Sequence, residues 1–346
     1  MRIAVYGAGA MGTVLGALLA QSGADVDLIS RNRPHIEAMR KRGARLYWKT
    51  EERETNQQVC ALLPEEMKGK YDIVFLMTKQ RENRQIAAFL KDYLSAEGIV
   101  CTAQNGFPEE SVAEVLGEER TYGAVAAWGA NFIGEGKVEV TSVPEAMSVE
   151  IGSYSGKGEK LDSLEKLLRP LGEIVKNPDF VTRTENLVGS RWSKLSINAA
   201  FSGLSVLTGL TFGELARRKK SKRIALGILR ECFSVAAAAG VKLEKLQGHD
   251  MEKLLGGSGF FARHRAAFLL PIAMKKHAKL RSGMLRDVQS SRKCEIDYID
   301  GAVSRCGDKY GVDTPLCDKV TEIVHGIENG LYETTYGNVD FFEGQY

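Results

Sequence analysis

The sequence predicts an α/β fold in which a parallel sheet with covering helices is followed by an all-helical domain. Three observations predict it. A glycine-rich turn, GAGAMG at 7–12, separates a short β-rich run from a helical stretch. β-rich and helical stretches then alternate as far as residue 102, and beyond residue 179 the pattern is nearly all helical. Together they indicate an N-terminal Rossmann-type dinucleotide-binding domain, 1–178, and an all-helical C-terminal domain, 179–346.

The elements of the first domain follow from composition and periodicity. Strands are predicted at 2–6, 25–30, 72–77 and 98–102, and helices at 10–22, 34–42, 81–94 and 161–171. The run DIVFLM at 72–77 is continuously apolar, as expected for a strand buried on both faces. Three later runs, 122–132, 137–142 and 147–152, are predicted to extend the sheet in antiparallel fashion. The turn Asn177-Pro178-Asp179 places the domain boundary.

The second domain is predicted to contain helices at 185–201, 212–240, 251–255, 284–306 and 315–330. The tail after Tyr332 has no clear periodicity, and we expect a loosely packed extension there. A basic run, RRKKSKR at 217–223, is predicted to be a solvated helix face. Because no aromatic residue interleaves this run, it does not indicate a nucleic-acid-binding surface.

Composition limits the class of protein. The 346 residues are 44% hydrophobic and 26% charged, which is typical of a globular chain of about two domains. The net charge of +3 is too small to indicate nucleic acid, although it would suit an anionic ligand. No apolar stretch is long enough for a transmembrane helix, and no signal peptide is evident, so we expect a cytoplasmic protein without a membrane partner. The six cysteines and five histidines are scattered, so we expect reduced thiols and no metal site.

The glycine-rich turn is predicted to bind the pyrophosphate of a dinucleotide. Gly7 would permit the tight turn, Gly9 would let the backbone approach the ligand, and Gly12 would let helix and strand pack closely. The N–H groups of the next helix, which begins with Ala10 and Met11, would then receive the anion.

The end of the second predicted strand indicates which dinucleotide binds. NAD-specific domains carry Asp or Glu there, whereas this chain has Ser30 and Arg31. A hydroxyl and a guanidinium suit a 2′-phosphate, so NADP is the predicted cofactor. Lys79 and Asn105 follow two further strands at the same edge of the sheet, where ligands bind, and could face the dinucleotide.

A helix around 189–201 carries Lys194 and Asn198, which share one face because they are four residues apart. Periodicity alone would make Lys194 a solvated surface residue.

With these motifs the chain resembles the ketopantoate (2-dehydropantoate) reductase family over essentially its whole length. The matching segments are GAGAMG, the Arg31 loop, TKQ at Lys79, QNG at Asn105, RWSKLSIN at Lys194, LTFGEL, GMLRDV, EIDYIDG at Glu295 and GVDTP at 311–315. The resemblance implies a Rossmann domain joined to a helical domain, and NADPH-dependent reduction of a small 2-oxo acid. The family reaction converts 2-dehydropantoate to pantoate in pantothenate biosynthesis. A homodimer is left open.

The resemblance also implies roles for individual residues. Lys194 resembles the general acid that protonates the ketone oxygen, and Glu295 resembles the acid near it. Asn198 resembles a residue that hydrogen-bonds substrate, while Lys79 and Asn105 resemble residues near the nicotinamide ribose. A positioned cation with a transferable proton would stabilise the charge that builds on oxygen during hydride addition.

The chain departs from the family pattern on the substrate side. Where the family has serine before the methionine of GMLRDV, this chain has Gly283, with Ser282 one place earlier. Ser202 replaces an asparagine one turn after Asn198, and Leu280 replaces another. Ser202 and Ser282 are therefore the candidate substrate-binding hydroxyls.

Two alternatives remain. One is a related NADP-dependent oxidoreductase that acts on a different 2-oxo or hydroxy acid. The other is a non-catalytic NADP-binding sensor, which would keep Gly9 and Arg31 but would not need Lys194 and Glu295.

Overall fold

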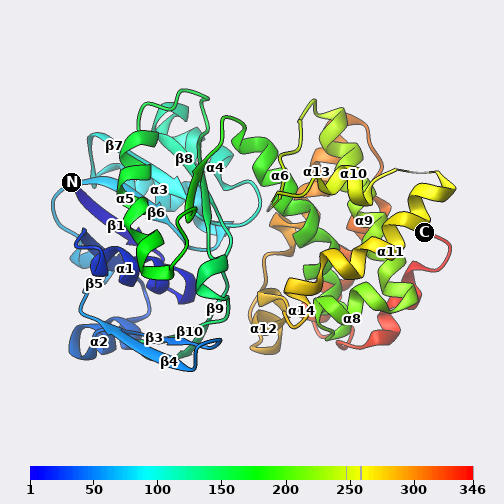
Figure 1. The fold of residues 1–346 in the computed structure, drawn as a ribbon, viewed down its shortest axis with the longest axis horizontal. Helices are drawn as coiled ribbons and strands as arrows, with labels where there is room; N and C mark the ends of the chain where they lie inside the picture. Colours follow the sequence, from blue (N-terminus) through cyan, green and yellow to red (C-terminus); the bar gives the residue numbers. More distant parts are fainter. Residues whose placement is uncertain (247, 258, 346) are drawn as a thin grey trace. The chain divides into compact units, whose positions relative to one another are not determined.

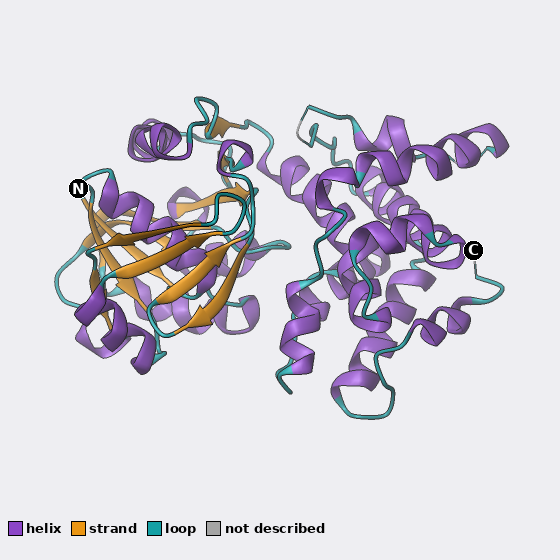
Figure 2. Ribbon diagram, turned by 60° about the horizontal axis from the view of Figure 1, so that its bottom comes forward, coloured by secondary structure: helices purple, strands orange, loops and turns teal. Residues whose placement is uncertain are grey.

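The computed structural model describes residues 1–246, 248–257 and 259–345, and this part of the chain divides into two compact units (Figure 1). The N-terminal unit comprises Met1–Gln104 and Pro108–Leu187; the C-terminal unit comprises Asn105–Phe107 and the residues from Val188 onward. The division falls at Leu187 rather than at 178, because β12 (Val181–Arg183) pairs with β11 (Val149–Ser153) and keeps the chain in the first unit. Figure 2 shows strands gathered in the first unit and helices filling the second, as the predicted fold class requires.

The main sheet has the strand order β12-β11-β8-β7-β6-β1-β2-β5. Strands β8 to β5 of this order are parallel to one another. β11 pairs antiparallel with β8, and β12 pairs parallel with β11, so these two strands run opposite to the rest. Because β1 lies between β2 and β6, the chain order reverses at β1, which is the point where dinucleotides bind in such sheets. The remaining strands are β1 (Arg2–Tyr6), β2 (Asp25–Ile29), β5 (Cys60–Leu62), β6 (Tyr71–Leu76), β7 (Leu94–Thr102) and β8 (Thr121–Ala126).

The helices of this unit accompany the sheet in alternation along the chain. They are α1 (Ala10–Gln21), α2 (Arg33–Arg42), α3 (Asn83–Lys91), α4 (Pro108–Leu116) and α5 (Leu161–Val175). The helix α1 packs closely on β2, because Gly16 leaves room for the Leu28 side chain. The predicted helix at 81–94 is wrong at its end, since Leu94 already begins the long strand β7.

A second sheet, with the order β4-β3-β10-β9, corrects the prediction of a single extended sheet. Its strands are β3 (Ala44–Trp48), β4 (Arg53–Gln57), β9 (Ala130–Gly134) and β10 (Lys137–Val140). The strands β3 and β4 were not predicted, and the run 122–132 divides between the two sheets. Leu46, Trp48, Val138 and Val140 join the buried cluster of α1, so this sheet covers the helix that follows the glycine-rich turn.

The buried His35 connects three elements of the N-terminal unit. Its Nδ1 accepts a hydrogen bond from Gly136 N–H in the β9–β10 turn at 2.9 Å, which places the ring proton on Nε2. Nε2 lies 3.0 Å from the Thr13 hydroxyl on α1. Burial lowers the pKa of His35 to about 4, so the ring is neutral at physiological pH.

The C-terminal unit is built from helices packed around one apolar cluster. They are α6 (Leu187–Asn198), α7 (Leu204–Thr208), α8 (Phe212–Arg217), α9 (Lys219–Ala238), α10 (Met251–Leu255), α11 (Phe260–Ala273), α12 (Gly283–Gln289), α13 (Asp300–Tyr310) and α14 (Pro315–Glu328). Two helix predictions need correction, because 212–240 is interrupted at Arg218 and 284–306 divides into α12 and α13. The helix α11 was not predicted. Within the described residues, every helix is too short or too polar to cross a lipid bilayer.

The tail after Tyr332 is not loosely packed as predicted. Val339 and Phe342 are fully buried in a 3-10 helix, Tyr336–Phe342, and belong to the core of the C-terminal unit. Part of the basic run holds this tail in place, because Lys220 forms ion pairs with Asp340 at 2.5 Å and Glu343 at 2.7 Å. The run is therefore not simply a solvated face.

Candidate active site

The glycine-rich turn has the geometry that the motif predicts. Gly7 adopts φ +108°, and a Cβ there would lie 2.5 Å from Thr78 N, so only glycine fits. A Cβ on Gly12 would lie 2.3 Å from Gly7 O, which explains the close packing of turn and helix. Gly9 is exposed, and a Cβ there would meet nothing closer than 4.0 Å. The backbone at Gly9 therefore remains open to a ligand.

The helix α1 begins beside this opening with Ala10 and Met11. The first N–H groups of a helix have no intrahelical partners, and its N-terminus carries partial positive charge. No acidic residue lies in the first turn of α1 to neutralise that charge. The turn and the helix start therefore fit the pyrophosphate of a dinucleotide.

Ser30 and Arg31 lie directly after β2. The Ser30 hydroxyl accepts a hydrogen bond from Asn32 N–H at 3.2 Å. The Arg31 guanidinium forms an ion pair of 2.8 Å with Glu82, which lies after β6 at the end of a 3-10 helix, Gln80–Glu82. Glu82 was not predicted from the sequence, and no local pattern could have found it, because the contact joins the loops that follow two different strands.

The loops after β6 and β7 are held together by side-chain amides. Gln104 donates from Nε2 to Thr78 O and to Asn83 Oδ1, both at 2.7 Å. Lys79, which follows Thr78, is exposed at the carboxyl edge of the sheet. Lys79 and the glycine-rich turn are thus brought to the same edge, since a Cβ on Gly7 would touch Thr78.

Asn105 belongs to a short segment, Asn105–Phe107, that is part of the C-terminal unit. The ring of Phe107 packs against Trp192 of α6 with a centroid distance of 4.9 Å. Asn105 is exposed. The structure therefore associates the Asn105 segment with the helix that carries Lys194, a grouping that sequence position does not reveal.

Lys194 is half-buried on α6 rather than solvated, as periodicity alone would predict. The pKa of its ammonium is lowered from 10.5 to about 7, because burial disfavours the charged form and the Arg191 guanidinium repels it. The helix is fixed by Ser193, whose hydroxyl donates to Gly189 O at 2.9 Å and to Glu244 O at 2.6 Å. A lysine with a pKa near 7 can both carry and release a proton at physiological pH, as a general acid must.

Asn198 ends α6, and the chain continues directly into a π-helical turn, Ala199–Gly203. Ser202 lies within this turn and is buried, while Asn198 is half-buried. Such turns occur frequently at functional sites. The turn is also closely packed, because a Cβ on Gly203 would lie 2.3 Å from the Val320 side chain.

Ser282 is the N-cap of α12. Its hydroxyl accepts from Met284 N–H at 3.1 Å, and its own N–H donates to the Ser205 hydroxyl at 3.2 Å. The Ser282 hydroxyl therefore already has a structural role as the N-cap, and it keeps its proton and one lone pair to offer a ligand. Leu280 is exposed, and its carbonyl accepts from Phe212 N–H at 2.9 Å. A Cβ on Gly283 would meet no atom within 4 Å.

Glu295 is half-buried at the start of the 3-10 helix Ile296–Tyr298. It precedes α13 and does not lie in the middle of a helix, as the predicted helix at 284–306 implied. Its backbone carbonyl accepts from Tyr298 N–H at 3.0 Å. Glu295 therefore does not lie on the face of a continuous helix.

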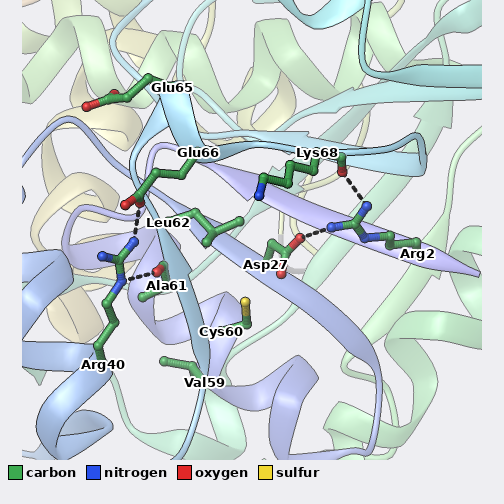
Figure 3. A pocket seen from close by; sticks show the side chains of 10 residues that line it. All are labelled: Arg2, Asp27, Arg40, Val59, Cys60, Ala61, Leu62, Glu65, Glu66 and Lys68. Carbon is green, nitrogen blue, oxygen red and sulfur yellow. Dashed lines mark hydrogen bonds and ion pairs between the residues drawn. The ribbon is translucent and has the colours of Figure 1, made fainter.

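A pocket of about 690 Å³ in the N-terminal unit contains none of these residues (Figure 3). It is lined by Arg2 and Cys60, which begin their strands, so it lies toward the amino ends of the strands and away from the glycine-rich turn. Arg2 pairs with Asp27 at 2.8 Å, and Arg40 pairs with Glu66. These two ion pairs use four of the charged side chains that line the pocket.

Two family models match the chain. The model described as ketopantoate reductase PanE/ApbA matches residues 3–156, and its C-terminal counterpart matches residues 186–328. A 2-dehydropantoate 2-reductase of Lactococcus lactis is 28% identical over 96% of this chain and 99% of its own length. One of Archaeoglobus fulgidus is 26% identical over 95% of this chain and 98% of its own length.

Solved structures show the same architecture. A ternary structure of D-mandelate dehydrogenase with NADH and anilino(oxo)acetate has a TM-score of 0.80 at 26% identity, covering 96% of this chain and 99% of that one. A PanE/ApbA family ketopantoate reductase from Ralstonia eutropha has a TM-score of 0.79 at 26% identity and the same coverage. The predicted fold class and family are thereby confirmed. The chain belongs to the ketopantoate reductase family and is a 2-dehydropantoate 2-reductase-like oxidoreductase.

Proposed function

We propose that this chain reduces a 2-oxo acid to the 2-hydroxy acid with NADPH, and that 2-dehydropantoate, the precursor of pantoate in pantothenate biosynthesis, is its substrate. The observation that carries the proposal is Lys194, whose half-buried ammonium has its pKa lowered to about 7 on α6. A solvated helix lysine would keep a pKa near 10, and a lysine shifted this far is typical of acid–base catalysis. Relatives that match nearly the whole chain are named 2-dehydropantoate 2-reductase, and this supports 2-dehydropantoate as the substrate.

The cofactor is proposed to lie against the glycine-rich turn. The N–H groups at the start of α1 would bind its pyrophosphate, while Lys79 and Asn105 would contact the nicotinamide side. When bound, the dinucleotide supplies a hydride to the carbonyl carbon of the substrate. Ser30 and Arg31 would bind the 2′-phosphate, although Arg31 first has to share or release Glu82. The related D-mandelate dehydrogenase structure holds NADH, so the proposal of NADPH rests on Ser30 and Arg31 of this chain and not on that relative.

Residues of the C-terminal unit would bind the substrate and protonate its carbonyl oxygen. As the carbonyl carbon gains hydride, its oxygen gains negative charge and takes a proton from the Lys194 ammonium, which leaves a neutral amine. Glu295 would orient Lys194 and favour reprotonation from solvent. Asn198, Ser202 and the Ser282 hydroxyl would hydrogen-bond the carboxylate and hydroxyl groups of the substrate. The exposed, apolar side chain of Leu280 can offer the substrate no hydrogen bond.

The test is steady-state oxidation of NADPH with 2-dehydropantoate, pyruvate, 2-oxoisovalerate and the 2-oxo acid that corresponds to mandelate. We expect the highest kcat/KM for 2-dehydropantoate. We also expect Lys194→Ala to lower kcat by about 10² to 10⁴ while NADPH still binds. A kcat/KM for 2-dehydropantoate no better than that for pyruvate would refute the substrate. A Lys194→Ala variant with wild-type turnover would refute the role of Lys194 and leave the substrate standing.

A further inference from the structure

The ion pair between Arg31 and Glu82 spans the edge of the sheet at which the order of the strands reverses. Arg31 follows β2 and Glu82 follows β6, and these strands flank β1 on its two sides. Tyr6 ends β1. Burial is the main reason why the pKa of its hydroxyl is raised, and the two charges of the pair also act on that pKa, since Arg31 lowers it and Glu82 raises it. The pair therefore extends across the end of β1, beside the glycine-rich turn.

The chemistry of the pair opposes the chemistry of a 2′-phosphate. A phosphate monoester carries about −1.5 to −2 charges at neutral pH and binds arginine through several hydrogen bonds. In this structure the Arg31 guanidinium already faces a carboxylate at 2.8 Å. A 2′-phosphate would have to displace that carboxylate or lie next to its like charge. A ribose 2′-hydroxyl, by contrast, can donate a hydrogen bond to a carboxylate, which is how NAD-specific domains recognise it.

We propose that Glu82 is a cofactor-selectivity residue, whose carboxylate competes with the 2′-phosphate for Arg31 and accepts a hydrogen bond from the 2′-hydroxyl of NADH. The inference rests on the proposed dinucleotide site. It follows that Glu82 supplies, from the loop after β6, the acid that is missing after β2. The pair is exposed, with 72% of the Arg31 side chain and 38% of the Glu82 side chain accessible, so it is weak enough for a dianionic phosphate to break. The chain therefore binds both dinucleotides, with a smaller preference for NADPH than Arg31 alone would give.

The chain offers a matched control for this inference. Arg33, two residues after Arg31 at the start of α2, pairs with Glu65 at 3.0 Å, and both side chains are exposed. Glu65→Gln removes the same charge by the same change as Glu82→Gln, but it releases Arg33 instead of Arg31. The two variants therefore separate a local effect on Arg31 from a general loss of negative charge near the loop.

The experiment is titration calorimetry of the unliganded protein with NADPH and with NADH at one fixed ionic strength. We expect Glu82→Gln to tighten NADPH about tenfold and to weaken NADH about threefold, the scale of one charge-assisted hydrogen bond. Arg31→Ala should weaken NADPH about tenfold or more, and Arg31→Ala combined with Glu82→Gln should show no gain for NADPH. Glu65→Gln should change both dissociation constants less than twofold.

Three results would overturn the inference. Glu82→Gln could leave the ratio of the two dissociation constants unchanged, or Glu65→Gln could tighten NADPH as much as Glu82→Gln does, which would assign the phosphate to Arg33. The gain for NADPH could also persist in the double variant. A wild-type protein that binds NADPH and NADH equally, with Arg31→Ala unchanged toward both, refutes the proposed 2′-phosphate site itself. A failure of the 2′-phosphate site can be told apart from a failure of the Glu82 inference, because the wild type and Arg31→Ala reveal it without Glu82→Gln.

Discussion

Lys194 predicts opposite pH dependences for the two directions of the reaction. Reduction needs the ammonium form, and with a pKa of about 7 the protonated fraction falls to about 10% at pH 8 and about 1% at pH 9. We therefore expect kcat/KM for 2-oxo acid reduction to fall about tenfold for each pH unit above 7, because kcat/KM reports groups of the enzyme before substrate binds. Oxidation of the 2-hydroxy acid needs the neutral amine, so its kcat/KM should rise with pH and level off above 7.

The measurement is kcat/KM for the substrate at saturating cofactor between pH 5.5 and 9.5, a range of about four pH units that brackets the pKa of Lys194. The matched variant is Lys194→Arg, because a guanidinium keeps its proton over this whole range. Its low residual activity should lack the limb near pH 7. A limb that persists in Lys194→Arg, or a flat wild-type profile, would show that Lys194 does not titrate in the rate-determining step.

Three further predictions concern single changes. His35 is neutral in the fold with a pKa of about 4, so the folded protein binds fewer protons than the unfolded chain between about pH 6.5 and 4. The free energy of unfolding should therefore fall by about 3 kcal/mol as the pH is lowered through that window. Urea unfolding should show this loss in the wild type but not in His35→Gln. Gly283→Ser introduces the hydroxyl that the family pattern has at this position, where there is open space for a Cβ. It should raise kcat/KM for 2-dehydropantoate about fivefold without a gain for pyruvate. An equal gain for both substrates would contradict a specific hydrogen bond. Phe342→Ala should destabilise the protein by about 3–5 kcal/mol, whereas the same change at the half-exposed Phe341 should cost less than about 1 kcal/mol, and equal urea midpoints for the two would refute the packing of the tail.

The elements that the sequence predicted correctly are those whose cause is local. The strand β1, the glycine-rich turn and α1 follow each other within about twenty residues, and each is specified by its own composition. The position of Gly7 is one example, because its positive φ is a property of the turn itself. The pairing of Lys194 and Asn198 on one face is another, since helix periodicity requires it.

The elements that were missed depend on contacts between distant segments. The strands β3 and β4 at 44–57 pair with each other, but they join a four-stranded sheet because β10 at 137–140 pairs with β3, and no local pattern identifies that partner. The tail was predicted to be loose because its sequence lacks periodicity, yet Phe342 is buried and Lys220, more than a hundred residues earlier, pairs with Asp340. The helix predicted at 284–306 divides into α12 and α13, and between them Cys294 N–H donates to the Glu328 carboxylate on α14 instead of to a helical carbonyl.

For the candidate site the same distinction holds. The sequence by itself determined the kinds of groups that are present: a glycine-rich turn before a helix, a serine and an arginine where an acid is absent, and a lysine and an asparagine one turn apart. Only the tertiary structure decided their chemical state. Burial and the neighbouring Arg191 lower the pKa of Lys194, and Glu82 from another loop occupies Arg31. The physical reason is that residue type and spacing are local properties, whereas desolvation and charge pairing depend on which distant side chains the fold brings within a few ångströms.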